Sequence, residues 1–413
     1  MTMSDFPVLK ASASSLRTTN PIRQIVDGMK TVPNPDLADI RLSIGDPTIF
    51  GNFSVPDSVN AALVEAINSK KFNGYPPSTG YESARAAIAK AYGSDPRAPL
   101  TPADVIIASG CSGAIELAIS AMADEGQNIL LPRPGFSLYQ TIAEARGVEV
   151  RHYDLVAEKN WEASIESIEA LIDAKTAFIL ITNPSNPCGS NYSEAHLLEL
   201  LAVAQKHRLP IFADEIYADM VFSGQTFTHI ARLSTDVPVI SAGGLAKRFM
   251  VPGWRLGWLT IHDRHGQLAQ IRDGLNRLSQ LVLGANSLLQ GVLPTILLET
   301  EQSYFDNNNR MLEELANTTV EAIRKIPGLQ PIAPQGAMYV MVKIDPVALP
   351  EFAGNDSRFC ERLIAEQSVH CLPGACFGVP GYFRIVFTSP KEKLAEAFAR
   401  MADFCRKYHV SQE

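Results

Sequence analysis

The sequence predicts an α/β fold built on a mainly parallel sheet with helices on both faces. Two observations predict this fold. Short apolar runs that are typical of buried strands recur along the first two thirds of the chain, and helical patterns lie between several of them. At 413 residues the chain is also long enough for two or three cores, so we expect more than one domain.

The elements of the large sheet come first along the chain. The expected strands occupy residues 104–108, 128–131, 176–182, 209–213 and 237–241. A helix is expected over residues 112–122, and another over residues 193–207 behind a Ser cap. In folds of this kind ligands bind at the carboxyl ends of the strands, so the residues directly after each strand are the candidates for function.

The last third of the chain predicts a smaller α+β part. After Gly257 the chain is expected to turn helical, over residues 268–283 and 307–326. Strands at 336–344 and 382–387 and helices at 357–367 and 390–408 follow. We expect residues 73–320 to form the large domain, with residues 1–72, an arm and part of the small domain, joining residues 321–413.

Charge and composition exclude several classes of function. A net charge of -8 and a pI near 5.6 argue against a nucleic-acid surface, which needs clustered Lys and Arg. No stretch reaches the roughly 18 to 20 apolar residues of a membrane span, and no signal core begins the chain. The six cysteines show no metal-ligand spacing, so we expect reduced thiols in a cytoplasmic protein, with a mitochondrial location as the alternative. Residues 1–20 are expected to form a mobile arm.

The first two strand ends carry features that suit a phosphate and a flat ring. Gly110, Cys111 and Ser112 open a helix, where free backbone N–H groups and the positive end of the helix dipole favour an anion. Phe136 follows the second strand and could stack on a planar cofactor. Each feature also has an ordinary explanation, as a capped turn and as a core side chain.

The next strand ends add polar and charged groups. Asn186 lies in an irregular Asn-Pro turn, and Asp214 emerges directly from an apolar run, where a buried carboxylate needs a positive partner. Lys247 stands among small residues, where partial desolvation lowers a lysine pKa and makes the amine a nucleophile towards aldehydes. Arg255 follows, with a guanidinium fork that fits phosphate. Together these groups predict a site for pyridoxal phosphate, which needs a Schiff-base lysine and an acid for its ring nitrogen.

The motifs that carry these residues closely resemble those of the fold-type-I aminotransferases and, within them, of the eukaryotic tyrosine aminotransferases. The similarity covers nearly the whole chain. Its most specific stretches are GGLAKR at 243–248 and VPGWRLGW at 251–258, with further stretches at 20–23, 42–48, 183–190, 336–339 and 366–373. The resemblance implies a seven-stranded, mainly parallel sheet in the large domain and a smaller α+β domain.

The resemblance also implies roles for single residues. Lys247, Asp214 and Tyr217 are the expected catalytic residues, with Lys247 bound to the cofactor aldehyde carbon, Asp214 on the ring nitrogen, and Tyr217 and Asn186 on the ring hydroxyl. Residues expected to hold the rest of the cofactor are Arg255, Gly110, Cys111, Ser112, Phe136 and, from a neighbouring subunit, Tyr75. Arg384, Asn186 and Gly45 are expected to bind the substrate.

The implied reaction is the transfer of the amino group of L-tyrosine, and of other aromatic or apolar amino acids, to 2-oxoglutarate or another oxo acid. The product would be 4-hydroxyphenylpyruvate, and Tyr75 implies a homodimer. Gly113 departs from the family, which usually has Gln there. Three alternatives stay open: a pyridoxal-phosphate lyase on the same scaffold, an aminotransferase of broad specificity and a binding module without turnover. No GxGxxG follows the first strand, which disfavours a nicotinamide dehydrogenase.

Overall fold

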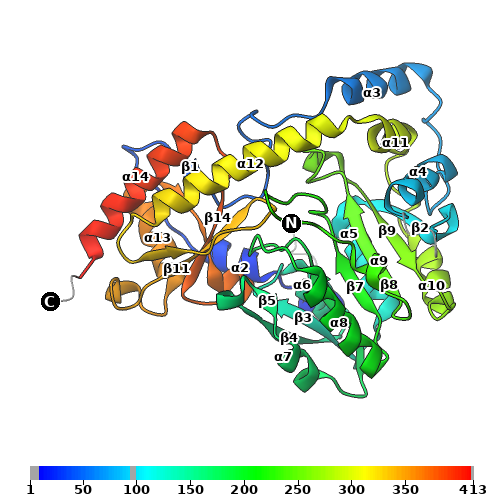
Figure 1. Ribbon diagram of the computed structural model, residues 1–413, viewed down its shortest axis with the longest axis horizontal. Helices are drawn as coiled ribbons and strands as arrows, with labels where there is room; N and C mark the ends of the chain where they lie inside the picture. The colour runs from blue at the N-terminus through cyan, green and yellow to red at the C-terminus, as the bar shows by residue number, and fades with distance from the viewer. Residues whose placement is uncertain (1–8, 94–98, 411–413) are drawn as a thin grey trace, which may run out of the picture.

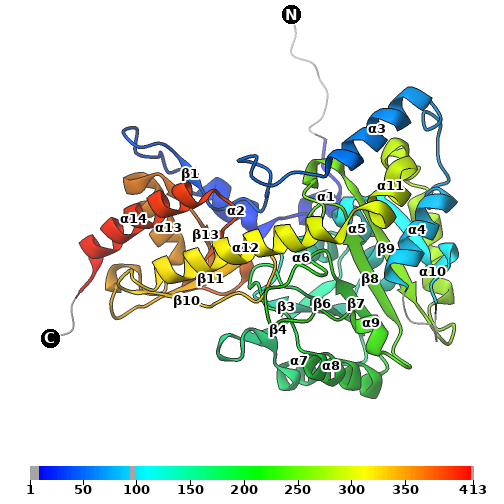
Figure 2. The same cartoon turned by 45° about the horizontal axis from the view of Figure 1, so that its top comes forward.

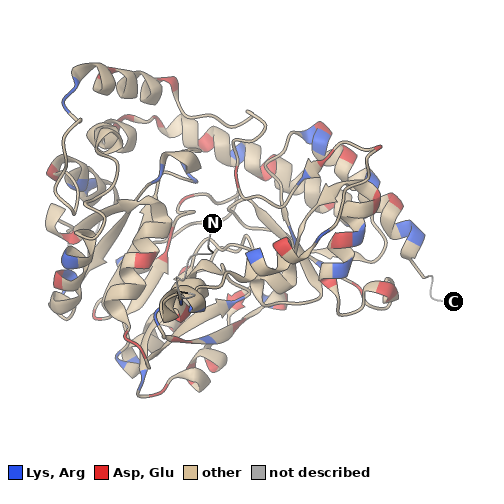
Figure 3. Cartoon of the chain, turned by 180° about the vertical axis from the view of Figure 1, so that it is seen from behind, with Lys and Arg blue, Asp and Glu red and all other residues tan. Residues whose placement is uncertain are grey.

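A computed structural model describes residues 9–93 and 99–410 of the chain. Two main sheets lie side by side, and the long helix α12 (Gln302–Ile323) runs across both in Figures 1 and 2. Lys and Arg are interspersed with Asp and Glu over both parts (Figure 3). None of the helices in the described part of the chain combines the length and the apolar character of a membrane span.

The larger sheet is mainly parallel, as predicted. In spatial order its strands are β2 (Val105–Ser109), β9 (Leu256–His262), β8 (Val239–Gly244), β7 (Ile211–Asp214), β6 (Thr176–Thr182), β3 (Asn128–Arg133), β4 (Glu149–Val156) and β5 (Glu162–Ala163). The neighbours from β8 to β4 pair in parallel, whereas β9 runs antiparallel to both β2 and β8. The two-residue β5 adds an eighth, antiparallel strand to the expected seven.

Both faces of this sheet are covered, because alternate residues of its strands enter different cores. Ile129 and Leu131 of β3 pack in one core with α5 (Gly110–Met122), whereas Leu130 packs in another with α8 (Glu194–His207). The side chain of Ser193 accepts a hydrogen bond from the backbone N of His196, so the expected cap of α8 is confirmed. The other helices of this part are α3 (Asp57–Ser69), α4 (Glu82–Tyr92), α6 (Leu138–Ala145), α7 (Ile165–Leu171), α9 (Ile230–Leu233), α10 (Ala269–Ser279) and α11 (Ser287–Glu299).

The structure corrects the expected start of the helical region after Gly257. Strand β9 continues to His262 before α10 begins, and α10 ends at Ser279. Glycine inside an apolar run weakens a strand pattern, and here it hides one. Gly257 is required because a Cβ atom at this position would collide with the backbone of Gly110 and Cys111. The absent side chain therefore lets the antiparallel strand approach the first turn of α5.

The second sheet has the expected α+β character. Its antiparallel strands are β10 (Leu329–Pro331), β11 (Tyr339–Ile344), β14 (Tyr382–Val386) and β13 (Leu372–Pro373), and helices α13 (Asp356–Gln367) and α14 (Lys391–Tyr408) accompany them. Strand β1 (Ile40–Arg41) pairs in parallel with β12 (Val369–His370). An early segment of the chain is thereby joined to a late one. The expected domain boundaries stay a prediction.

In the described part of the expected N-terminal arm, a short helix contacts α6, and residues 1–8 lie outside the described residues. Helix α1 (Ala13–Arg17) is tied to the end of α6, because Ser14 Oγ donates a hydrogen bond to the carbonyl of Ala145 at 3.0 Å. Arg17 pairs with Glu125 at 3.1 Å. Helix α2 (Pro21–Gly28) follows and brings Ile22 to the pocket described next.

Candidate active site

A pocket of about 260 Å³ lies at the carboxyl ends of the parallel strands, between the two sheets. Ten of the twelve residues predicted for the site line it: Gly45, Cys111, Ser112, Phe136, Asn186, Asp214, Tyr217, Lys247, Arg255 and Arg384. Gly110 adjoins it through Arg255. Tyr75 does not line it. The rule that ligands bind at strand ends therefore gathers side chains that are up to about 340 positions apart in sequence.

One end of the pocket forms an anion cradle. Ser109 precedes α5 without a side-chain cap, so the first amides of the helix remain available to a ligand. A Cβ atom at Gly110 would lie 2.5 Å from Arg255 Nη2, which shows how closely the guanidinium approaches this turn. Arg255 has a left-handed φ of 55° and donates from Nη1 to the carbonyl of Pro252 at 3.0 Å. Helix amides and a fixed guanidinium together suit a phosphate group.

Lys247 projects into the pocket from the turn after β8. Its Nζ donates a hydrogen bond to the carbonyl of Gly45 at 2.5 Å and lies 5.9 Å from the centre of the Tyr217 ring. Within the described residues Lys247 forms no ion pair. Its amine is therefore held by a carbonyl oxygen, which can be exchanged for a ligand without separating two charges.

Asp214 is a buried carboxylate with an exposed fraction of 2%. It accepts hydrogen bonds from Tyr139 OH at 2.6 Å, from the backbone N of Ile216 at 3.1 Å and from Cys111 Sγ at 3.6 Å. Burial raises the pKa of Asp214 above its ordinary value, although these three hydrogen bonds oppose the rise. No cation of the described chain pairs with it. A positively charged ligand group would therefore be stabilised here.

Tyr217 and Tyr339 meet above the lysine. Their hydroxyl oxygens are 2.6 Å apart, and their rings pack edge to face with centroids 5.6 Å apart. Burial raises the pKa of Tyr217 well above its ordinary value, so its hydroxyl is a proton donor at neutral pH. Tyr339 comes from β11 of the second sheet and brings that sheet into the site.

Arg384 is the buried cation of the second sheet, with an exposed fraction of 4%. It donates from Nη1 to Asn186 Oδ1 at 2.8 Å and from Nη2 to the carbonyl of Ser43 at 2.7 Å. The rings of Tyr339 and Phe377 lie 4.5 and 4.8 Å from its guanidinium carbon. Its Nε is buried and has no partner among the described residues, and burial lowers the pKa of the guanidinium. A carboxylate would supply the missing acceptor and the missing charge.

The two predicted aromatic residues have different surroundings. Phe136 lines the pocket and meets Tyr139 edge to face at 5.6 Å. Tyr75 is 88% exposed and borders a separate surface hollow formed with residues 282–287. The role predicted for Tyr75 thus involves no atom of this chain's own pocket.

Three aromatic residues that shape the site are not among those predicted from the sequence: Tyr139, Tyr339 and Phe377. A signal existed for Tyr139, because it lies three residues after Phe136 in the same segment after a strand. Tyr339 lies in the second sheet, 122 residues from its partner Tyr217, and Phe377 lies in the turn beside that sheet, where its ring contacts Arg384. No local pattern connects residues so far apart.

The pocket thus combines an anion cradle, an amine, a buried carboxylate and a second cation that lacks an acceptor. The sequence matches the family model "Aminotransferase class I and II" over residues 38–401. A tyrosine aminotransferase of Mus musculus is 52% identical over 406 residues, which cover 98% of this chain and 89% of that protein. A tyrosine aminotransferase of Dictyostelium discoideum is 46% identical, with 97% of each chain covered.

Solved structures agree with this relationship. The crystal structure of a tyrosine aminotransferase from Leishmania infantum superposes with a TM-score of 0.94 at 35% identity, covering 98% of this chain and all of that one. The likeness therefore extends over both sheets and the pocket between them.

Proposed function

The chain belongs to the class I and II aminotransferases, and from that membership we propose that it transfers the amino group of L-tyrosine to a 2-oxo acid. With 2-oxoglutarate as acceptor the tyrosine product is 4-hydroxyphenylpyruvate. One observation in the pocket carries the proposal: a buried carboxylate without a cation and a lysine without a carboxylate line the same cavity. A ligand with a positively charged group for the carboxylate and an aldehyde for the amine would suit both groups.

Pyridoxal 5'-phosphate fits these residues as the cofactor. Its phosphate would be held by Arg255 and by the α5 amides of Gly110, Cys111 and Ser112. A Cβ atom at Gly110 would close this cradle, because it would meet the guanidinium of Arg255. Lys247 would hold its aldehyde carbon, and Asp214 its ring nitrogen. When bound, the cofactor supplies an electron sink that makes the substrate Cα–H acidic.

The chain's own residues then bind the amino acid and move its protons. Arg384 and Asn186 bind and orient the α-carboxylate, using the Nε that lacks an acceptor. The Lys247 amine takes the proton from the substrate Cα and delivers it to the cofactor aldehyde carbon. Asp214, held by Tyr139, would keep a proton on the cofactor ring nitrogen, and the Tyr217 hydroxyl, which shares a hydrogen bond with that of Tyr339, lies beside the lysine.

The lining outside these polar groups favours a large apolar or aromatic side chain. Ile22, Ile115 and Pro252 line the pocket together with the rings of Phe136 and Tyr139. Such a surface separates similar apolar side chains by only about 1 to 3 kcal/mol. We therefore propose tyrosine as the main substrate and expect phenylalanine, tryptophan, methionine and leucine to be slower ones.

We further propose a homodimer in which Tyr75 of one subunit reaches the phosphate in the other. Support comes from its 88% exposure and from the exposed apolar residues Leu281, Val282 and Leu283 near the same hollow. A cytoplasmic location, a large domain over residues 73–320 and a small domain from the two ends of the chain stay part of this proposal.

The test is an absorbance spectrum of the purified protein with bound cofactor, before and after L-tyrosine is added without an oxo acid. Loss of the long-wavelength band of the lysine-bound cofactor, with release of stoichiometric 4-hydroxyphenylpyruvate, would support the proposal. Release of ammonia would instead favour the lyase alternative. A protein that binds the cofactor and ignores tyrosine would contradict the substrate assignment.

A further inference from the structure

A buried ion pair lies behind the strand end that carries Asp214. Glu215 follows Asp214 directly, yet the two side chains face different cavities: Asp214 lines the active-site pocket, whereas Glu215 lines a small internal cavity behind it. Oε2 of Glu215 is 2.7 Å from Nδ1 of His229, and both residues are buried. Nothing in the proposed reaction uses this pair.

Glu215 is tied to its surroundings on every side. Its Oε1 accepts a hydrogen bond from the backbone N of Ile230 at 3.2 Å, and its own backbone N donates to the carbonyl of Ala242 in β8 at 3.0 Å. The next amide, that of Ile216, donates to Asp214 Oδ1. A movement of Glu215 would therefore move an amide that orients the Asp214 carboxylate.

The cavity beside the pair has a volume of about 20 Å³, enough for one water molecule. Ser241 Oγ lines it without a partner among the described residues, opposite Thr260 and His262. Ionisable groups of the described chain that act on this region are Tyr92, Asp104, Asp214, Asp219, Arg248, His262 and Arg264.

His229 offsets the effect of burial on Glu215. Burial lowers the pKa of His262 to about 4, so that ring is neutral at pH 7. Burial also acts to raise the pKa of Glu215, but the charge and hydrogen bond of His229 outweigh it and the pKa is lowered. Burial is the main cause of the raised pKa of Asp214, and the negative charge of Glu215 adds a smaller rise. The carboxylate of Glu215 is therefore ionised at a cost that His229 offsets.

We propose that Glu215 and His229 are positioning residues for Asp214. The pair fixes the peptide that follows Asp214 and cancels a negative charge that would otherwise act on it from behind. This inference rests on the proposed function, because Asp214 matters only if it meets the cofactor ring.

The test uses three variants, His229→Gln, Glu215→Gln and the double variant, with His207→Gln as the matched control. His207 also lies beside a glutamate, Glu169, but on α8 and α7, away from the site. At pH 8 the unpaired Glu215 carboxylate of His229→Gln should lower kcat with L-tyrosine by about tenfold or more, with KM changed less than about twofold. Cofactor affinity, measured by titrating the cofactor-free protein, should fall in the same variant.

The double variant separates charge from packing. It leaves no buried charge, so its kcat should return to within about threefold of that of the unchanged protein. The His229→Gln variant should also recover as the pH falls towards 6, because Glu215 then takes up a proton, whereas the double variant should show no such recovery. Glu215→Gln alone should be mild, since it removes the buried carboxylate that would act on Asp214.

Full kcat of His229→Gln at pH 8, or a double variant no better than His229→Gln, would overturn the inference. If His229→Gln does not fold, the double variant decides alone: activity near that of the unchanged protein supports the pair, and its absence overturns it. An unchanged protein that is inactive with L-tyrosine would contradict the proposed function instead, and cofactor affinity would still test the pair.

Discussion

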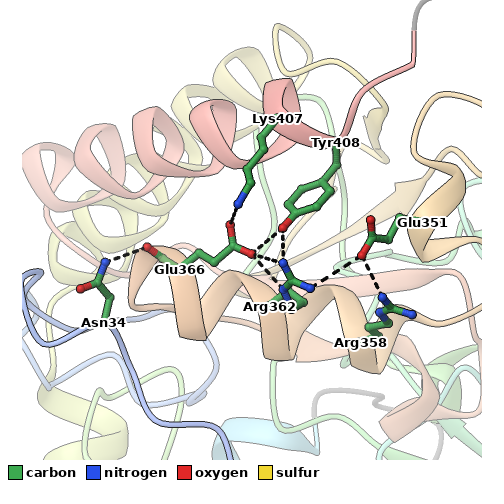
Figure 4. A network of polar contacts seen from close by, with 7 residues as sticks. All are labelled: Asn34, Glu351, Arg358, Arg362, Glu366, Lys407 and Tyr408. Carbon is green, nitrogen blue, oxygen red and sulfur yellow. Dashed lines mark hydrogen bonds and ion pairs between the residues drawn. The ribbon is translucent and has the colours of Figure 1, made fainter.

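Two carboxylates of this chain accept comparable numbers of hydrogen bonds, but their pKa values are shifted in opposite directions. Glu366, at the end of α13, accepts from Arg362 Nη2 at 2.6 Å, Lys407 Nζ at 2.7 Å and Tyr408 OH at 2.5 Å (Figure 4). Asp214 accepts from a phenol, a thiol and an amide. Burial acts to raise the pKa of both, but the cationic donors lower that of Glu366, whereas that of Asp214 stays raised.

The difference shows how a structural carboxylate can be told from one that awaits a ligand. The carboxylate of Glu366 is paired with the cations Arg362 and Lys407 and joins α13 to α14. Its backbone carbonyl also accepts a hydrogen bond from Asn34 at 3.1 Å (Figure 4). Asp214 has its hydrogen bonds but no opposite charge, and a cavity lies beside it. The missing element is a cation, which the proposed cofactor would supply through its protonated ring nitrogen.

The largest effect is expected from the lysine of the site. Lys247→Ala removes both the proposed covalent anchor of the cofactor and the proposed base, so kcat should fall by about 10⁴-fold or more. Steady-state assays with L-tyrosine and 2-oxoglutarate measure it. Lys407→Ala, which removes a lysine from the Glu366 network, is the matched control and should keep kcat within about twofold. Comparable losses of kcat in the two variants would contradict the proposed difference between the active-site pocket and the Glu366 network.

The next effect concerns the charge of the two carboxylates. Asp214→Asn should lower kcat by about 10² to 10³-fold, because an amide cannot stabilise the protonated cofactor ring. Glu366→Gln is the control for kcat. Single-turnover mixing with L-tyrosine separates this proton-transfer step from product release. An unchanged rate in Asp214→Asn would make Asp214 a structural residue like Glu366.

A smaller effect should follow from Tyr139→Phe, which removes the shortest hydrogen bond to Asp214. That bond lowers the pKa of Asp214, so its loss should move the pKa further up. If the reaction needs ionised Asp214, the variant should lose activity at a higher pH than the unchanged protein does when the pH is lowered. We expect about a tenfold loss of kcat at pH 7. Tyr153→Phe, which loses a buried bond to the carbonyl of Leu180, should leave the pH profile unchanged.

The smallest effect is expected at Glu366, and it concerns stability. Its pKa is lowered in the folded state, so its contribution is present above the ordinary value of 4.5 and is lost as the pH falls through the folded value. Glu366→Gln should cost about 1 kcal/mol of unfolding free energy at pH 7, since the pair partners are partly exposed. Urea unfolding at pH 7 and pH 4 measures it. A loss that is equal at both pH values would contradict the ionic origin.

The sequence was sufficient for the parts of the site that follow from local rules. Gly110, Asn186 and Lys247 each follow a buried strand, Asp214 ends one, and parallel strands end at one edge of a sheet. Their distant partners could not be predicted in this way. The bond between Tyr217 and Tyr339 crosses 122 residues and depends on how the two sheets pack. The late strand β9 was missed because Gly257 interrupts its apolar pattern.

Residues 43–45 carry a consequence for mutational scans of this chain. The carbonyl of Ser43 holds Arg384, and that of Gly45 holds Lys247, so this short segment touches the two cations through main-chain atoms alone. Replacing the side chain of Ser43 would leave both of these main-chain hydrogen bonds in place. A mutational scan would register only Gly45, where a Cβ atom would lie 2.6 Å from Tyr339 OH. Tolerance to substitution would therefore understate how much of the site these residues build.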